Sequence, residues 1–245
     1  MKKLKFKLIL NLINNLEESK INKINILNVN YNNKKIFSKI TSGSKNYISN
    51  CFKIGLKLVK DDKNIVLING PVSKKNFLQK RYLGVTEYIA KKTNSKKQVM
   101  LIYNDTISVS PITTHLPIKH VAKNITRTKI INNIKQIKKF YEDFIKKKPK
   151  IAVLGLNPHC ETIDKISEEK KIIIPAINLL KKIKLNIEGP YPADTFFLKK
   201  NIKKYDVVVG MYHDQVLTPL KTLYNFNAIN ITLGLPFLRI SPDHG

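Results

Sequence analysis

The chain contains few cysteines, no tryptophan and no long apolar run, and these shortages limit what it can be. Its two cysteines among 245 residues, Cys51 and Cys160, lie far apart and form no metal-binding spacing. No apolar run approaches the roughly 20 residues of a membrane-spanning helix. Lysines and asparagines interrupt the apolar stretch near the N-terminus, and no small-residue cleavage site follows it, which argues against a signal peptide. We therefore expect a reduced, cytoplasmic protein without a membrane span.

Acidic residues are also scarce, with 17 Asp and Glu against 45 Lys and Arg, for a formal net charge of +28. Such a charge is typical of nucleic-acid-binding proteins. However, only Arg81, Arg127 and Arg239 are arginines, whereas Lys, Asn and Ile are abundant. This combination is what an AT-rich genome encodes, and the lysines are spread along the chain instead of gathered in one block. We therefore expect no nucleic-acid partner.

The order of apolar segments predicts an α/β protein with a largely parallel sheet. The hydrophobic content of 42% fits a soluble globular chain of one large or two small domains. Residues 1–40 are polar and weakly patterned, and regular alternation of helix and strand signals begins at about residue 41. The expected strands are residues 64–68, 98–103, 106–112, 151–156, 207–211 and 228–233. The expected helices begin at Ser44, Thr128 and Ser167, and Pro111 predicts a short strand or an edge strand for 106–112.

Three of the five histidines follow predicted strands. His115 follows strand 106–112, His159 follows strand 151–156, and His213 follows strand 207–211. Strand carboxyl ends line the ligand crevice of an open α/β sheet, so these side chains are expected to converge. Three neutral imidazoles are a common ligand set for a catalytic divalent metal. Zinc, magnesium, manganese and cobalt are not distinguished by such a set.

A second group of residues is cationic or polar and lies near the same strand ends. Lys74, Lys221 and Arg239 suit a phosphorylated substrate, Arg through paired hydrogen bonds and Lys as a point charge. Asn230 lies inside an apolar strand, where its amide needs a partner. Asp194 and Asp214 are candidate acid, base or histidine-orienting groups. The chain has neither a GxGxxG fingerprint nor a P-loop, so a dinucleotide would bind without the usual Rossmann turn.

Several blocks of sequence, taken in order, resemble the signature stretches of the 4-hydroxythreonine-4-phosphate dehydrogenase family. The resemblance runs from about residue 40 to the end. Its longest blocks are GMYHDQVLTPLKTL and NITLGLPFLRISPDHG, which are long enough to be specific. The blocks are Asn69–Lys74, Thr86–Ala90, Thr113–Lys119, Gly155–His159, Gly189–Phe197, Gly210–Leu223 and Asn230–Gly245.

The resemblance implies a fold, a reaction and a set of site residues. The fold would be the two-lobed fold of isocitrate and isopropylmalate dehydrogenases, in a homodimer with the site at the subunit interface. The enzyme would oxidise 4-phosphohydroxy-L-threonine with NAD or NADP to a 3-oxo acid, which decarboxylates to 3-amino-2-oxopropyl phosphate in pyridoxal 5'-phosphate biosynthesis. One divalent metal ion would be bound by His115, His159 and His213. The substrate would contact Thr86, Lys221, Asn230 and Arg239, and we add Lys74 on its position alone.

The chain departs from the family pattern in ways that keep alternatives open. Val85 stands where the family has a substrate-contacting histidine. The N-terminal glycine- and proline-rich motif is absent and the sequence stops at Gly245, so we expect a fold truncated at both ends. One alternative is a paralogous dehydrogenase acting on threonate or erythronate 4-phosphate. Another is a non-catalytic relative that binds phosphate or polyanions. For the proton acceptor, Asp214, Asp194 and a metal-bound water remain open.

Overall fold

Eight strands form one sheet in the computed structural model, which describes residues 8–31, 40–62, 64–79, 81–82, 84–163 and 167–243. Across the sheet the order is β3-β10-β9-β4-β5-β8-β6-β7. Four pairings are parallel and three, β10–β9, β9–β4 and β4–β5, are antiparallel. The expected α/β class with a mostly parallel sheet is therefore confirmed. The strands are β3 (Leu67–Ile68), β4 (Val99–Tyr103), β5 (Ser108–Thr113), β6 (Ile151–Leu154), β7 (Ile187–Tyr191), β8 (Val207–Tyr212), β9 (Ile229–Leu233) and β10 (Arg239–Pro242).

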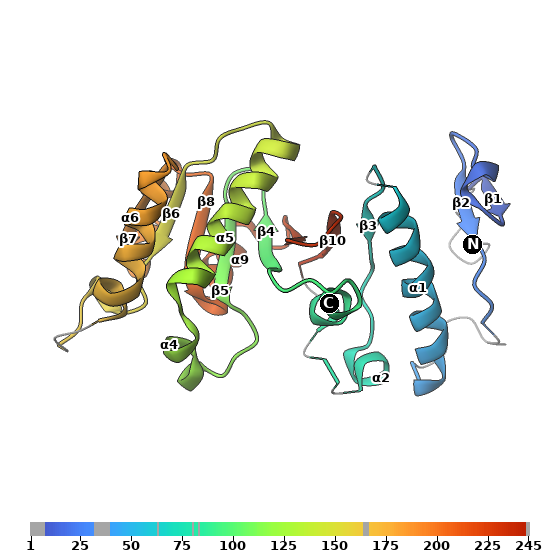
Figure 1. Ribbon diagram of the computed structural model, residues 1–245, viewed down its shortest axis with the longest axis horizontal. Coiled ribbons are helices and arrows are strands. Elements are labelled where there is room, and N and C mark those ends of the chain that lie inside the picture. The colour runs from blue at the N-terminus through green and yellow to red at the C-terminus, as the bar shows by residue number, and fades with distance from the viewer. Residues whose placement is uncertain are drawn as a thin grey trace.

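Helices cover both faces of the half of the sheet that contains β5, β8 and β6 (Figure 1). Val207 and Val209 face one apolar cluster, whereas Val208 faces the other, because successive side chains of a strand point to opposite faces. Helices α5 (Arg127–Phe140) and α6 (Ile174–Lys182) pack on the first face. The second face is covered by α7 (Ala193–Phe196), α8 (Lys199–Ile202) and α9 (His213–Tyr224).

A third apolar cluster lies beside β3, away from these two. It joins α1 (Lys45–Asp61), α2 (Lys74–Leu78) and α3 (Val85–Lys92) through aromatic rings. Phe77 stacks on Phe52 with ring centroids 5.5 Å apart and meets Tyr88 edge-on at 5.1 Å. Ser44 precedes α1 as expected, but its hydroxyl donates to the Thr41 carbonyl oxygen and does not cap the helix.

Short segments complete the chain. Strands β1 (Leu10–Ile13) and β2 (Ile24–Leu27) pair in parallel as a separate two-stranded sheet near α1 (Figure 1). The weakly patterned segment 1–40 therefore contains two strands, whereas residues 1–7 and 32–39 lie outside the described residues. The remaining helix is α4 (Val121–Asn124), and the short 3-10 segments are Leu16–Glu18, Ser42–Ser44, Ile118–His120 and Pro158–Cys160.

The helix expected from Thr128 is α5. Its N-cap is Thr126, whose hydroxyl oxygen accepts the Lys129 N–H at 3.2 Å. The apolar stripe of Ile130, Ile134 and Ile137 is buried as its one-turn spacing predicts. The helix ends in a wider π turn, Tyr141–Ile145, and a second π turn, Glu169–Ile173, precedes α6.

The expectation of a short or edge strand for 106–112 is wrong, because β5 is a six-residue strand in the interior of the sheet. Ser108 N–H donates to the Asp206 carbonyl on the β8 side, so by alternation the nitrogen of Pro111 faces β4. There the β4–β5 register covers only Ile102 and Val109. Ser110 Oγ donates to the Met100 carbonyl at 2.6 Å and supplies the hydrogen bond that proline cannot.

No helix in the described ranges is both long and apolar enough to cross a membrane.

Strand β7 carries Glu188, a carboxylate whose stabilising effect depends on pH. It accepts hydrogen bonds from Tyr205, Lys150 and Tyr191, and these lower the pKa of Glu188 to about 2. The contribution of Tyr205 to the shift is the largest and that of Tyr191 the smallest of the three. A carboxyl whose pKa is depressed by folding stabilises the fold above its unfolded pKa of about 4.3, and this contribution is lost as pH falls toward the folded value.

We expect Glu188→Gln to lower the free energy of unfolding by about 1 kcal/mol or less at pH 7, because the group is partly exposed and screened. The difference from the unmodified chain should shrink between pH 4.5 and about 2. Urea unfolding at several pH values measures it. Glu142→Gln, which removes a surface pair with Lys138, is the control. A difference that stays constant down to pH 2 would show that the Glu188 contacts do not depend on its charge.

Candidate active site

A cavity of ≈ 160 Å³ opens between the strand ends of the sheet and the first turn of α3. We call it the histidine cavity, because His115 and His213 both line it. Its volume lies below the roughly 300–1,000 Å³ typical of drug-sized ligands, so it suits a small substrate better than a whole dinucleotide. Six residues singled out from the sequence line it: Lys74, Thr86, His115, His213, Asn230 and Arg239.

His115 and His213 reach this cavity because their strands are neighbours. Strands β5 and β8 run in parallel, with Thr113 opposite Tyr212, and each histidine follows within two residues of that pair. The ring centroids are 6.0 Å apart. With metal–nitrogen bonds of about 2.1 Å, an ion lies roughly 3.2 Å from each ring centroid, so two rings share one ion at separations up to roughly 6.4 Å. The spacing of this pair lies within that limit, which applies to a linear arrangement, and is wider than the roughly 5.2 Å of two ligands at a tetrahedral ion.

Each of the three candidate histidines has a carboxylate near its Nδ1 atom. Asp214 Oδ1 lies 2.6 Å from Nδ1 of His213. Glu87 Oε1 lies 3.9 Å from Nδ1 of His115, and Asp194 Oδ2 lies 3.6 Å from Nδ1 of His159. A carboxylate on this side favours the tautomer that carries a proton on Nδ1 and leaves Nε2 free as a ligand. Neither Asp194 nor Asp214 lines the histidine cavity; Asp214 contacts His213, and Asp194 lies near His159 and accepts the Thr195 N–H.

The structure does not bring His159 to the other two histidines. Its side chain is 74% exposed, and it does not line the histidine cavity. Among the described residues, no three side chains of His, Cys, Asp or Glu come together in a group that could hold a metal ion. His159 stands five residues beyond the end of β6, whereas His213 directly follows β8. The intervening turn decides where the ring of His159 points.

That turn is held by the buried carboxylate of Glu169. Its Oε1 accepts the N–H groups of Leu156 and Asn157, each at 2.8 Å, and its Oε2 accepts Asn157 Nδ2 at 2.9 Å. Burial alone would raise the pKa of Glu169, but these hydrogen bonds outweigh it and the net shift is downward. The turn is closely packed, because a Cβ on Gly155 would lie 2.6 Å from the Cys160 sulfur. His159 is therefore presented outward by an anchored turn.

Arg239 is the most buried cation of the cavity, at 3% exposure. Its Nε donates to Asn69 Oδ1 at 2.8 Å, and its Nη1 donates to Thr232 Oγ1 at 2.9 Å and to Thr86 Oγ1 at 3.3 Å. Burial lowers the pKa of Arg239 to about 10, and the charge of Glu87 opposes this shift. The guanidinium stays charged at neutral pH and is held in one plane against the cavity.

Glu87 Oε2 and Asn230 Oδ1 are buried oxygen atoms of the cavity wall for which the described residues supply no hydrogen-bond partner. The proximity of His115 is the largest cause that lowers the pKa of Glu87, against the opposing effect of burial. Room for this carboxylate depends on Gly84, because a Cβ there would lie 2.8 Å from Glu87 Oε2. Two buried acceptors facing one cavity indicate a ligand that donates hydrogen bonds.

Sequence reasoning missed Glu87, although it lies within the Thr86–Ala90 block. The available signal was its charge, because carboxylates are scarce in this chain. Lys221, which was expected at the substrate, does not line the cavity directly. Its Nζ lies 3.7 Å from Oδ2 of Asp243, and Asp243 forms part of the wall.

The planar fork of Arg239 is the testable feature of this wall. Arg239→Lys keeps the charge but cannot reach Asn69, Thr86 and Thr232 together, so buried acceptors lose their donor. We expect the free energy of unfolding to fall by about 1–3 kcal/mol, measured by urea denaturation. Arg127→Lys, at an exposed arginine, is the matched control and should change it by less than about 0.5 kcal/mol. Equal effects of the two substitutions would contradict the role given to the fork.

Comparisons with known proteins agree on one family. A family model described as "Pyridoxal phosphate biosynthetic protein PdxA" matches residues 2–245. The 4-hydroxythreonine-4-phosphate dehydrogenase of Sulfurihydrogenibium sp. is 39% identical over 237 residues, which are 95% of this chain and 72% of that protein. The D-threonate 4-phosphate dehydrogenase of Pectobacterium atrosepticum is 38% identical over 165 residues, which are 67% of this chain and 51% of that protein.

A solved structure shows the same likeness in three dimensions. The putative 4-hydroxythreonine-4-phosphate dehydrogenase of Salmonella typhimurium superposes with a TM-score of 0.85 at 30% identity. The superposition covers 100% of this chain and 77% of that one.

Proposed function

We propose that this chain, which belongs to the family of the pyridoxal phosphate biosynthetic protein PdxA, oxidises the C3 hydroxyl group of 4-phosphohydroxy-L-threonine. The hydride acceptor is NAD or NADP, and the 3-oxo acid formed loses carbon dioxide to give 3-amino-2-oxopropyl phosphate. As a member of that family the chain is an oxidoreductase; its substrate is the part we propose.

One observation carries the proposal. A fixed guanidinium, two buried acceptor oxygens and a facing pair of imidazoles line a single small cavity. Arg239 and Lys74 bind the anionic groups of the substrate, Arg239 as a planar fork and Lys74 as a point charge. Asn230 Oδ1 and Glu87 Oε2 accept hydrogen bonds from its hydroxyl or ammonium group. Holding the substrate in one orientation is a large part of such catalysis.

The imidazoles suit a divalent ion, and their Nε2 atoms are the donor atoms that would hold it. When bound, the ion supplies Lewis-acid polarisation of the substrate hydroxyl, and the nicotinamide cofactor accepts the hydride. Asp214 keeps the Nδ1 proton on His213, and Glu87 places a negative charge 3.9 Å from Nδ1 of His115. We therefore assign Asp214 and Asp194 as positioning residues of the imidazoles.

His159 enters this proposal through a second copy of the chain. The ring is exposed on an anchored turn, whereas two imidazoles, His115 and His213, line the histidine cavity among the described residues. In a homodimer with the site at the interface, His159 of one subunit completes the ligand set of the other subunit. Lys221 contributes by pairing with Asp243 at the cavity wall.

A specific observation favours a second candidate, a dehydrogenase of threonate or erythronate 4-phosphate. Val85 lines the cavity, so an apolar group stands beside the substrate where a histidine was expected from the resemblance. Loss of an imidazole donor weakens recognition of a substrate with a matching polar group. The D-threonate 4-phosphate dehydrogenase of Pectobacterium atrosepticum is also 38% identical to this chain.

A substrate panel separates the two candidates. We expect 4-phosphohydroxy-L-threonine to give a higher kcat/KM than threonate 4-phosphate or erythronate 4-phosphate, measured by reduction of NAD or NADP with a divalent ion. Metal analysis should find about one ion per subunit, and His213→Ala should lose it. A higher kcat/KM for threonate 4-phosphate would establish the second candidate, and no turnover with stoichiometric phosphate binding would establish a non-catalytic relative.

Mixing two inactive variants tests the shared site. His159→Ala and His213→Ala should each be inactive alone, because each lacks one of the metal-binding imidazoles. After mixed refolding at equal amounts, half of the dimers combine the two variants, and each has one intact site. We therefore expect about a quarter of the unmodified activity to return. As a control, mixing His115→Ala with His213→Ala should restore none, because both residues serve the same cavity. No recovery in the first mixture would place all three ligands in one subunit.

A further inference from the structure

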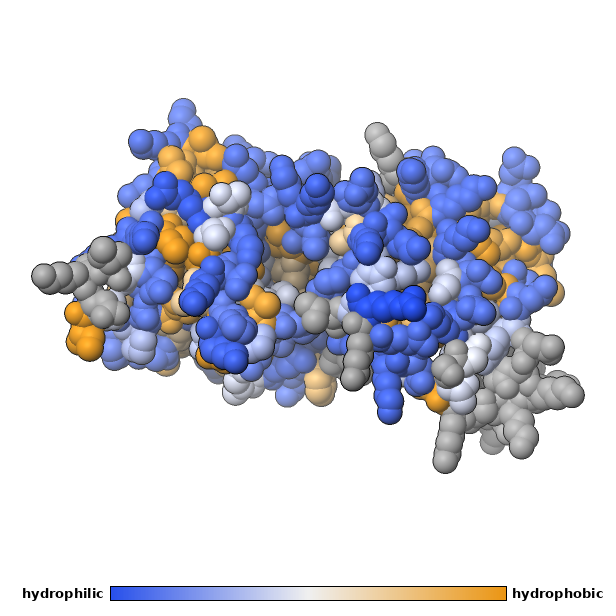
Figure 2. Space-filling model, turned by 60° about the horizontal axis from the view of Figure 1, so that its bottom comes forward, coloured by the Kyte–Doolittle hydropathy of each residue, from blue (hydrophilic) through white to orange (hydrophobic). Residues whose placement is uncertain are grey.

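A second cavity lies among α1, α2 and α3 and shares no lining residue with the histidine cavity. Its volume is ≈ 460 Å³. We call it the cationic cavity, because its lining, among the described residues, includes Lys45, Lys53, Arg81 and Lys92 and no Asp or Glu. Helix α2 lies at the bottom of the view in Figure 1. Figure 2 turns this lower side toward the reader and shows that hydrophilic residues cover most of it.

The floor of the cationic cavity is apolar and aromatic. Phe77, Leu78 and Tyr88 are buried, and Tyr82 meets Tyr88 edge-on at 5.3 Å between ring centroids. These rings belong to the third apolar cluster, which fixes them independently of any ligand. The cavity therefore offers a rigid apolar surface at its base.

Carboxylates of the described residues do not pair with the charges at the rim. In the described part of the chain, none of the four cations forms an ion pair with a carboxylate. Lys45 Nζ donates to Gln79 Oε1 at 2.7 Å, and Lys92 Nζ lies 5.9 Å from the Tyr88 ring centroid. Like charges around one cavity raise its potential, and an anion in the cavity lowers the energy of all four.

The rim of the cationic cavity contains an arginine, Arg81, whereas most positive charges of this chain are lysines. The chain has only three arginines, and a second one, Arg239, holds its fork against the histidine cavity. A guanidinium binds phosphate oxygens in pairs, which a lysine ammonium group cannot do. Its presence at this rim indicates recognition of a phosphate group beyond simple attraction of anions.

We infer that the cationic cavity is a binding site for a small phosphate monoester that carries an aromatic ring. The ring lies on the floor formed by Phe77, Leu78 and Tyr88, and the phosphate meets Arg81 with Lys53 and Lys92 at the rim. This site is separate from the proposed dehydrogenase chemistry, although α3 borders both cavities with different residues.

Calorimetric titration of the metal-free chain with phenyl phosphate tests the inference. We expect one site per chain and an affinity at least about tenfold higher than that for inorganic phosphate, because the ring buries apolar area. Phenol alone should bind more weakly than phenyl phosphate by a similar factor or more. Equal affinities for phenyl phosphate and inorganic phosphate would overturn the inference, as would several equivalent sites, which indicate only attraction to the positive surface.

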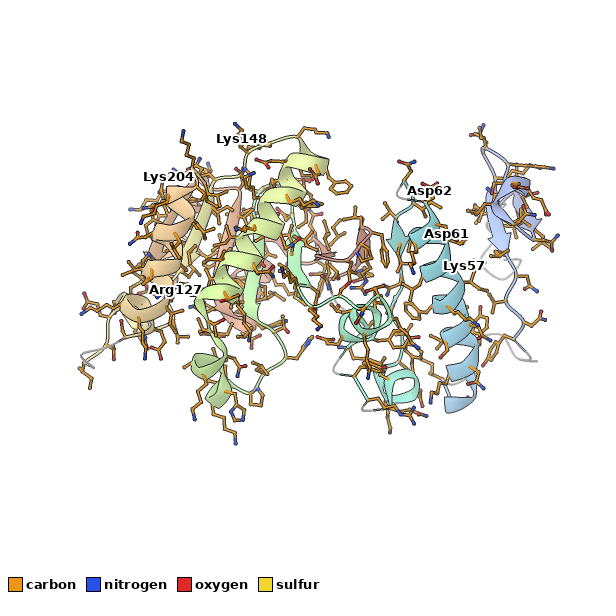
Figure 3. The ribbon with its side chains drawn as sticks, viewed as in Figure 1. Lys57, Asp61, Asp62, Arg127, Lys148 and Lys204 are labelled. Atoms are coloured by element: carbon orange, nitrogen blue, oxygen red, sulfur yellow. The ribbon has the colours of Figure 1, made fainter. Side chains whose placement is uncertain are left out.

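Matched variants locate the site. Arg81→Gln and Lys53→Gln should each weaken phenyl phosphate binding about tenfold through loss of a charged hydrogen bond. Their controls are Arg127→Gln and Lys57→Gln, at residues that do not line the cavity and are labelled in Figure 3. These controls should leave the affinity unchanged, and so should His213→Ala, which tests the dehydrogenase proposal separately. Equal weakening by Arg81→Gln and Arg127→Gln would overturn the inference.

Discussion

The buried guanidinium of Arg239 links three parts of the fold by hydrogen bonds, in addition to the sheet and the third apolar cluster that also join them. It reaches Asn69 in the segment after β3, Thr86 in the first turn of α3, and Thr232 on β9. A buried cation is costly unless donors and acceptors around it are matched, so these partners must hold their positions. The wall of the histidine cavity therefore has a defined shape before any ligand binds.

A second buried charge, the carboxylate of Glu169, fixes the turn that carries His159. Glu169 accepts hydrogen bonds from two backbone N–H groups of the turn after β6, and this turn holds His159 on the surface. A carboxylate lies near Nδ1 of each candidate imidazole, and at His213 it is at hydrogen-bond distance, which favours a proton on that atom. The chain has few acidic residues. Three of them, Glu87, Asp194 and Asp214, lie near candidate histidines, and Glu169 holds a turn.

Local sequence patterns predicted elements well where burial was uniform. Val207–Tyr212 and Ile151–Leu154 are apolar on both faces, as expected of strands covered by helices on both sides. The sequence pattern gave a wrong prediction for β5, where the Ser110 hydroxyl donates the hydrogen bond to β4 that the backbone of Pro111 cannot donate. Sequence patterns also missed β7 and β10, because proline, glycine and charged residues interrupt these strands. In both cases neighbouring strands stabilise a segment that has little strand preference of its own.

The sequence by itself determined the fold class, the family and which residue types carry the chemistry, because motifs and periodicity are local properties of the chain. Tertiary structure decided which of those residues meet. His115 and His213 come together since their strands are neighbours and each histidine lies within two residues of the strand end. His159 does not join them, because it stands five residues beyond the end of β6, on a turn anchored by the carboxylate of Glu169. Convergence depends on strand order and turn direction, and neither is encoded in the spacing of the histidines.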